Sequence, residues 1–111
     1  MRQLARGTGV GKPIDWSAMD KNADAAAALL KALANSQRLR ILCLLVGGEH
    51  SVSEINAAVA LSQSALSQHL ARLREEGLVT TRREAQTIHY ALADGPAAHI
   101  IATLHGFYCA T

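Results

Sequence analysis

Apolar residues recur along most of the chain at the 3.6-residue period of helices that bury one face. The first such stretch, KNADAAAALLKALA, is rich in alanine and has three larger apolar residues, Leu29, Leu30 and Leu33. We expect this helix to begin near Ser17, whose spacing to Asp20 resembles a capping box. Asn35 or Ser36 is expected to end it and to cap the next helix.

The second stretch, SQRLRILCLLVGG, is apolar on nearly all sides, which predicts a helix at the centre of the fold. One side carries Leu39, Leu42, Cys43 and Val46, and the other carries Ile41, Leu44 and Leu45. Gly47 and Gly48 are expected to end this helix. Ser51 or Ser53 then begins a short helix, EINAAVA, whose inward residues are Ile55 and Val59.

The third stretch, LSQSALSQHLARLREEGL, predicts a helix with one apolar side and one uncharged polar side. The buried face consists of Leu66, Leu70 and Leu73. Ser62 caps this helix and Gly77 ends it. Its exposed early turns carry Gln63, Ser64, Ser67 and Gln68. Ser and Gln are common on solvated surfaces, so this helix alone does not identify a binding face.

Residues 79–92, VTTRREAQTIHYAL, alternate as two strands around a turn at Glu84 to Gln86. The alternation places Ile88, Tyr90 and Leu92 on one side and Thr87, His89 and Ala91 on the other. A last helix follows Asp94, Gly95 and Pro96. Its expected buried face is Ala97, Ile100, Ile101, Leu104 and Tyr108.

These elements predict a mainly α fold with a small β-hairpin, in the order of a winged helix-turn-helix. We expect a flexible tail at residues 1–15 and one domain at residues 16–111. Half of the 111 residues are apolar and few are aromatic, a composition of packed helices that can share a core between subunits. Small polar side chains allow a helix to enter the major groove, where Gln pairs with adenine and Ser adapts to several base edges.

The net charge of +2 is too small to indicate a nucleic-acid partner by itself. Its distribution is more informative, because four arginines gather in the second half of the chain: Arg72, Arg74, Arg82 and Arg83. Arginines there can attract phosphates without reading sequence. Protection of an edge strand by charge is the alternative explanation for Arg82 and Arg83.

No segment reaches the roughly 18 apolar residues of a membrane span, and the N-terminus lacks the apolar core of a secretion signal. We therefore expect a cytoplasmic protein with no membrane partner. In a reducing compartment, the two cysteines are more often free, metal-binding or redox-active than a permanent bridge.

Four blocks, LLKALANSQRLRILCLL, SVSEI, LSQSALSQHLARLREEGLV and RREAQTIHYAL, follow the order of the ArsR/SmtB family of bacterial transcriptional regulators. The chain resembles that family from Ala25 to Cys109. The resemblance implies a homodimeric winged-helix repressor that binds double-stranded operator DNA. The DNA-binding candidates that it implies are Ser62, Gln63, Ser64, Ser67, Gln68, His69 and Arg72 on the recognition helix, and Arg82, Arg83 and Gln86 on the wing.

Members of this family read different signals through different residues. The paired cysteines of arsenic-type members are absent from SVSEINAAV, which excludes that site. His99 and His105 lie about 240° apart on a helix. His105 and Cys109 supply only two ligands, whereas zinc needs three or four. We therefore expect no metal and no cofactor, and a metal-responsive repressor stays an alternative.

Cys43 and Cys109 have an ordinary interpretation, because free cysteine is often buried simply as a small apolar residue. The chain also resembles the dithiol sulfur- and redox-sensing subgroup of SqrR-, BigR- and HlyU-like regulators, which has cysteines at these two places. The resemblance implies that reactive sulfur species or an oxidant links Cys43 to Cys109 through a disulfide or a longer sulfur bridge. That bridge would lower the affinity for the operator.

An enzyme would need a nucleophile, a base and an orienting group. Cys109 with His105 is the only local pair and lacks the third group, so we expect no enzyme. A winged-helix protein-interaction module without DNA binding stays an alternative, because fold alone does not fix function.

Overall fold

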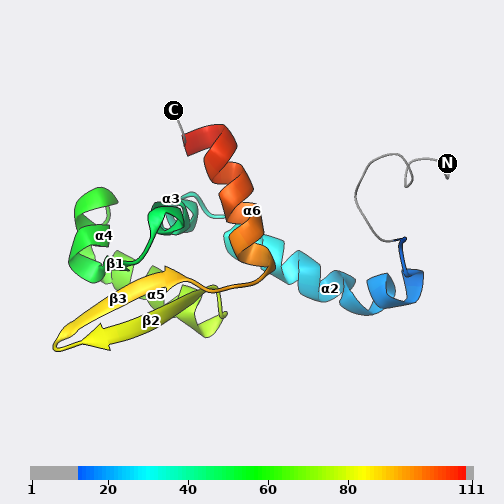
Figure 1. Cartoon of the computed structure of the whole chain (residues 1–111), viewed down its shortest axis with the longest axis horizontal. Helices are drawn as coiled ribbons and strands as arrows, with labels where there is room; N and C mark the ends of the chain where they lie inside the picture. The colour runs from blue at the N-terminus through cyan, green and yellow to red at the C-terminus, as the bar shows by residue number, and fades with distance from the viewer. Residues whose placement is uncertain (1–12, 110–111) are drawn as a thin grey trace.

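The computed structural model describes residues 13–109 of the chain. In this part, helices α2 and α3 are followed by strand β1, helices α4 and α5, strands β2 and β3, and helix α6 (Figure 1). This is the winged helix-turn-helix order that the sequence predicts, with one additional short strand. The predicted flexible tail falls largely on residues 1–12, which lie outside the described residues.

Helix α2, Trp16–Leu33, extends away from the rest of the molecule (Figure 1). Its N-cap is Asp15, whose carboxylate accepts hydrogen bonds from the backbone amides of Ser17 and Ala18 at 3.0 and 3.2 Å. The expected cap at Ser17 is therefore wrong, because Asp15 already satisfies the free amides of the first turn. Leu33 is the buried residue of α2, so most of this helix is exposed in the single chain.

Helix α3, Ser36–Leu44, continues into a 3-10 turn, η1, Leu45–Gly47. Asn35 caps it, and its side-chain oxygen accepts hydrogen bonds from two backbone amides of the first turn, both at 3.0 Å. The predicted boundary at Asn35 is confirmed. The buried residues of this segment are Ile41, Leu42 and Leu45, and the other apolar side chains are half-buried. The segment contacts α5 and α6, which gives it the expected central position.

Strand β1, His50–Ser51, leads directly into helix α4, Val52–Ala58. Ser51 and Glu54 form a capping box: the Glu54 amide donates to Ser51 Oγ at 3.2 Å, and the Ser51 amide donates to Glu54 Oε1 at 2.8 Å. Two of the amides at the start of α4 are thereby satisfied. The expected start at Ser51 is confirmed, and Ile55 faces the core as predicted.

Helix α5, Gln63–Glu75, follows α4 after a short turn. Ser62 caps it, because its Oγ accepts a hydrogen bond from the Ala65 amide at 3.1 Å. The buried residues of α5 are Leu66, Leu70 and Leu73, the three predicted from their spacing. Gly77, at a φ of 73°, follows the end of the helix in the left-handed region that glycine adopts at little cost.

The wing consists of strand β2, Val79–Glu84, strand β3, Thr87–Leu92, and the turn between them. The strands pair antiparallel, with Val79 opposite Leu92. Strand β1 pairs with the other edge of β3, so β3 is the central strand of a three-stranded sheet. The sequence did not predict β1, because two residues are too few to produce a recognisable alternation.

Helix α6, Pro96–Leu104, packs against α3 and continues into a π-helical turn, η2, His105–Cys109. Ala97 and Ile101 are buried as expected, but Tyr108 is 82% exposed and does not join the buried face. The wider π turn rotates the residues after Leu104 away from the positions of a regular α-helix. The α-helical period therefore does not predict which residues are buried after Leu104.

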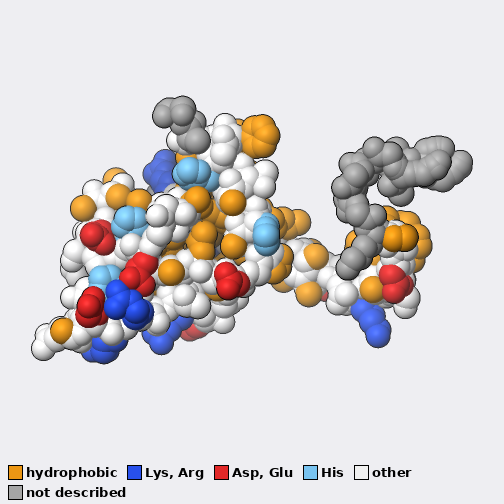
Figure 2. Space-filling model, viewed as in Figure 1, with side chains coloured by type: hydrophobic (Ala, Val, Ile, Leu, Met, Phe, Trp, Pro, Cys, Tyr) orange, Lys and Arg blue, Asp and Glu red, His pale blue; other side chains and the backbone are white. Residues whose placement is uncertain are grey.

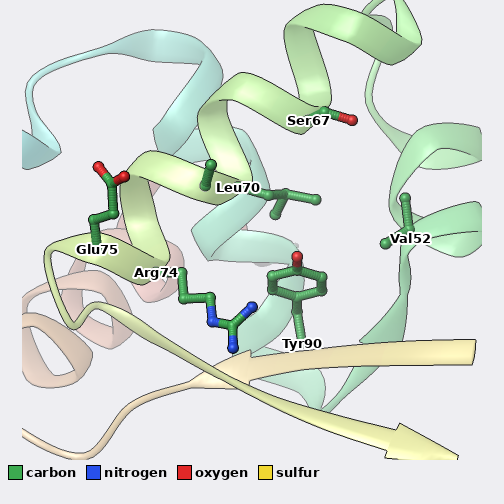
Figure 3. Close-up of a pocket in the computed structure, with 7 residues that line it drawn as sticks. Val52, Ser67, Leu70, Arg74, Glu75 and Tyr90 are labelled. Atoms are coloured by element: carbon green, nitrogen blue, oxygen red, sulfur yellow. The ribbon is translucent and has the colours of Figure 1, made fainter.

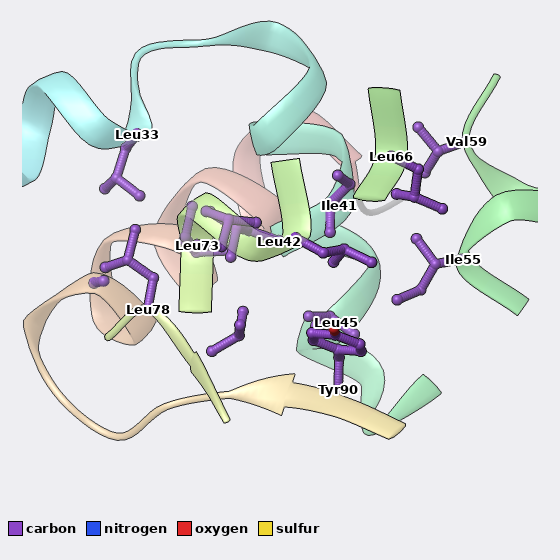
Figure 4. Packing of buried hydrophobic residues seen from close by; sticks show 14 residues of the cluster. Leu33, Ile41, Leu42, Leu45, Ile55, Val59, Leu66, Leu73, Leu78 and Tyr90 are labelled. Atoms are coloured by element: carbon purple, nitrogen blue, oxygen red, sulfur yellow. The ribbon is translucent and has the colours of Figure 1, made fainter. Parts of the chain in front are cut away.

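One hydrophobic core lies between the helices and the sheet (Figure 4). Leu42 and Leu73 meet near its centre, and Ile55 and Leu66 close it where α4 approaches α5. Tyr90 covers it from β3. Within residues 13–109, no helix combines the length and apolar character needed to cross a membrane.

Candidate nucleic-acid interface and dithiol site

Helix α5 presents an uncharged polar edge to solvent. Burial of its three leucines turns the opposite and flanking positions outward. The sequence-predicted residues that are exposed there are Ser62, Gln63, Ser64, Ser67 and Gln68. Small hydroxyl and amide side chains give an edge that can approach base edges closely and hydrogen-bond to them.

Two other candidates on α5 differ from this edge. His69 is half-buried, on the side of the helix away from Ser67. Arg72 is exposed, and its Nε donates to Glu76 Oε2 at 3.1 Å. An exposed ion pair of this kind is weak, so Arg72 can exchange Glu76 for a phosphate.

Arg82 is held by an acidic partner that sequence reasoning missed. Its Nε and Nη2 donate to both carboxylate oxygens of Glu49 at 2.6 to 3.2 Å, and its Nη1 lies 3.5 Å from Glu84. The Arg82 guanidinium holds the pKa of Glu49 below its ordinary value, chiefly through these hydrogen bonds. Glu49 precedes β1 and lies far from Arg82 in the sequence, so no local pattern indicated the pair.

The remaining wing candidates are open to solvent. Arg83 and Gln86 are both exposed, Gln86 in the turn between β2 and β3. Arg82 and Arg83 are consecutive in a strand, so their side chains point to opposite faces of the wing. Figure 2 shows Lys and Arg side chains close to acidic ones over the wing. Its positive charge is therefore partly neutralised.

The structure brings the two cysteines together, although one comes from α3 and the other from the end of η2. The Cys43 and Cys109 thiols interact, and both side chains line the same two cavities, of about 250 and 330 Å³. The larger cavity also includes His105. Both cysteines are free thiols; Cys43 is partly buried and Cys109 is exposed.

The two thiols have unequal surroundings. Burial, together with a smaller contribution from a hydrogen bond to Cys109 and charge repulsion with it, raises the pKa of Cys43 to about 11. Cys43 is therefore almost wholly protonated at neutral pH and is a weak nucleophile there. Among the described residues, no group of three His, Cys, Asp or Glu side chains is arranged to hold a metal ion. The chemistry available at this site is that of two neighbouring thiols.

Residues 35–81, from the cap of α3 into the wing, match a family model described as "Bacterial regulatory protein, arsR family". The transcriptional activator HlyU of Vibrio cholerae is 52% identical over 99 residues, which cover 89% of this chain and 92% of HlyU. The chain belongs to the ArsR family. A second relative is the biofilm growth-associated repressor of Agrobacterium fabrum. It is 45% identical over 108 residues, which cover 93% of this chain and 92% of that repressor.

Solved structures agree with this assignment. Reduced HlyU from Vibrio cholerae has a TM-score of 0.79 at 52% identity, over 85% of this chain and 99% of that one. A homodimeric winged helix-turn-helix DNA-binding domain from Mycobacterium bovis has a TM-score of 0.68 at 34% identity, over 88% of each chain. The protein is thus a DNA-binding transcription regulator of the HlyU-like ArsR subgroup, and not an enzyme.

Proposed function

We propose that this ArsR-family regulator is a cytoplasmic, homodimeric repressor that binds double-stranded operator DNA and releases it when a sulfur bridge forms between Cys43 and Cys109. The inducer is a reactive sulfur species or peroxide. The observation that carries the proposal is that two thiols from separate helical elements lie close together and line the same cavities. A pair of structural cysteines that merely filled space would have no reason to meet at a solvent-accessible cavity.

The DNA contacts are proposed from the exposed surfaces of α5 and the wing. The early turns of α5 face the bases in the major groove. The base-facing residues are Gln63, Ser64, Ser67, Gln68 and, at the side, His69, with Ser62 at the start of the helix. Arg72 contacts the backbone, and Arg82, Arg83 and Gln86 contact the backbone and the adjacent minor groove. In a homodimer, the two copies of α5 meet successive major-groove turns about 34 to 36 Å apart.

The bridge forms in two balanced steps. With a polysulfide, the Cys109 thiolate attacks one sulfur, an S–S bond breaks, and a shortened polysulfide anion leaves with its electron pair. The Cys43 thiolate then attacks the inner sulfur of the Cys109 persulfide and expels hydrosulfide, which gives a disulfide. With peroxide, the first step gives a sulfenic acid and hydroxide, and the second releases a further hydroxide, which takes up a proton to become water. Each route transfers two electrons from the thiols to the reagent.

The bridge would act on DNA affinity through the helices that it joins. It ties α3, at the centre of the fold, to η2 at the end of α6, and α3 also contacts α5. A link that disfavours the DNA-competent arrangement shifts the population of dimers away from it. A coupling free energy of about 3 kcal/mol weakens binding about 150-fold, which is enough to release an operator.

The test is operator binding by reduced, polysulfide-treated and peroxide-treated protein, on DNA from upstream of its own gene. We expect treatment to weaken wild-type binding about 150-fold and to leave Cys43→Ser and Cys109→Ser unchanged. Cys43→Ala is a control for Cys43→Ser, because it removes the thiol without placing a hydroxyl at this partly buried position. Intact mass should fall by about two hydrogens for a disulfide, or rise by whole sulfur atoms for a longer bridge.

Two outcomes would contradict the proposal. Normal release of DNA by Cys43→Ser would exclude the dithiol switch. Phosphate contacts make DNA binding steeply salt-dependent. If wild-type protein does not bind the DNA, or binds it with an affinity that does not change with salt, the protein is instead a protein-interaction module.

A further inference from the structure

A groove of about 350 Å³ runs between helix α5 and strand β3 (Figure 3). One wall consists of α5 residues, among them Ser67 and Arg74, and the other includes Tyr90. Arg74 and Tyr90 have no part in the DNA contacts proposed above. The groove lies beside the exposed edge of α5, since Ser67 belongs to both.

The polar groups of the groove are arranged around one space. Ser67 and Arg74 are about two helical turns apart and therefore lie on the same side of α5. In Figure 3, Arg74 extends toward Tyr90, and the Tyr90 hydroxyl points toward α5. The carboxylate of Glu75, which also lines the groove, points away from these groups.

Arg74 differs from two other arginines near this surface. Arg72 is paired with Glu76, and Arg82 is paired with Glu49. Within residues 13–109, Arg74 has no carboxylate in ion-pair distance, and no group hydrogen-bonds to the hydroxyl of Tyr90. The ring of Tyr90 is packed in the core at 9% exposure, so the hydroxyl is held in place by the fold. The groove thus contains an unneutralised cation and a fixed hydroxyl donor.

We infer that this groove binds a phosphate of the DNA backbone, with Arg74 supplying charge and the hydroxyl of Tyr90 donating a hydrogen bond. The inference rests on the proposed docking of α5 and the wing on duplex DNA. With α5 in the major groove and the wing at the adjacent minor groove, the backbone strand that separates the two grooves passes between α5 and β3. This is where Arg74 and Tyr90 lie. A phosphate contact there fixes the depth and register of α5 without reading sequence.

The test is fluorescence-anisotropy titration of reduced protein with the operator and with an unrelated duplex over a range of salt concentrations. Arg74→Gln should weaken binding to both duplexes alike, by about ten-fold. The slope of log affinity against log salt should fall by about two, because a homodimer loses one phosphate contact in each subunit. Arg40→Gln, an exposed arginine on α3 beside the dithiol cavities, is the matched control and should match wild type.

Two further variants test the arrangement of the groove. Tyr90→Phe keeps the buried ring and removes the hydroxyl, and should weaken binding to both duplexes by a smaller factor than Arg74→Gln. Glu75→Gln removes the nearby negative charge and should tighten binding to both. Thermal unfolding followed by circular dichroism confirms that each variant is folded.

The inference is wrong if Arg74→Gln binds both duplexes with the affinity and salt slope of Arg40→Gln, or if it weakens binding to the operator alone. Failure of the proposed function has a different signature. In that case wild-type protein binds neither duplex, or Gln68→Ala, on the base-facing edge, keeps the full preference of wild type for the operator.

Discussion

At the scale of single residues, the surroundings of the two cysteines assign each a step in the proposed switch. Cys109 is exposed and meets the reagent first. Cys43 is partly buried and has a pKa of about 11, so at pH 7 only about one molecule in ten thousand carries its thiolate. Cys43 is therefore suited to close the bridge slowly rather than to start it. In the proposed switch, slow closure would leave time for a single modified cysteine to be reduced before the bridge forms.

This difference predicts a pH dependence for closure of the bridge. A raised pKa favours the neutral thiol, so the reactive thiolate of Cys43 increases as pH rises toward that pKa. Burial is the largest cause of the shift, and it persists after Cys109 is modified. We expect the rate of closure to rise about tenfold per pH unit between about pH 7 and 10. Mass spectrometry of samples quenched with an alkylating reagent after a polysulfide pulse measures that rate.

Cys43→Ser is the control for this experiment, because it should accumulate Cys109 persulfide without closing at any pH. A closure rate that stays flat from pH 7 to 10 would contradict the assignment of Cys43 as the second nucleophile.

At the scale of elements, the sequence predicted helices better than strands, for a physical reason. Helix boundaries are set by contacts within a few residues, as the caps at Asn35, Ser51 and Ser62 show. Strand β1 depends on pairing with β3, and two residues carry no period of their own. The exposed Tyr108 reflects a local change to π-helical geometry that an α-helical period does not include.

An ion pair between Glu49, which precedes β1, and Arg82 on β2 joins the wing to a segment outside the hairpin. Glu49 neutralises part of the charge of Arg82, and a phosphate would have to compete with this carboxylate for the guanidinium. Glu49→Gln should release Arg82, tighten binding to any duplex and increase the magnitude of the salt slope by about one for each released arginine. Asp94→Asn, which removes an exposed carboxylate before α6, is the matched control. Weaker binding by Glu49→Gln would show instead that the ion pair positions the wing for DNA, and unchanged binding would show that Glu49 does not compete with DNA for Arg82.

At the scale of the whole molecule, the sequence did not predict which distant segments contact one another. The polar edge of α5 followed from leucine spacing alone, because burial of one helical face dictates the other. The meeting of Cys43 and Cys109 was implied by a family resemblance and not by any spacing. The Glu49 partner of Arg82 and the groove at Arg74 and Tyr90 had no signal at all, since both arise from packing between elements.

Helix α2 carries the strongest evidence that the proposed functional unit is a dimer. Trp16 and Leu30 are 67% and 56% exposed on a helix that projects from the chain, although large apolar side chains gain free energy from burial (Figure 1). A projecting helix of this kind is marginal alone in water. Phe107 and Tyr108, at the other end of the chain, are also exposed. A second copy of the chain that covers α2 would remove this apolar surface from water and set the spacing of the two copies of α5.

Leu30→Lys should therefore convert the dimer into a monomer of 11.8 kDa, because a charge in the covered surface is desolvated without a partner. Buried Leu33 is untouched, so the core of each subunit is kept. Loss of the second DNA-binding subunit should lower operator affinity by about 100-fold or more. Ala28→Lys adds the same charge to the opposite side of α2 and should leave the dimer intact.

Light scattering gives the mass of each variant, and anisotropy titration gives its affinity for the operator. A Leu30→Lys protein that remains dimeric would place the subunit contact elsewhere, and a monomer with full operator affinity would mean that one recognition helix is sufficient.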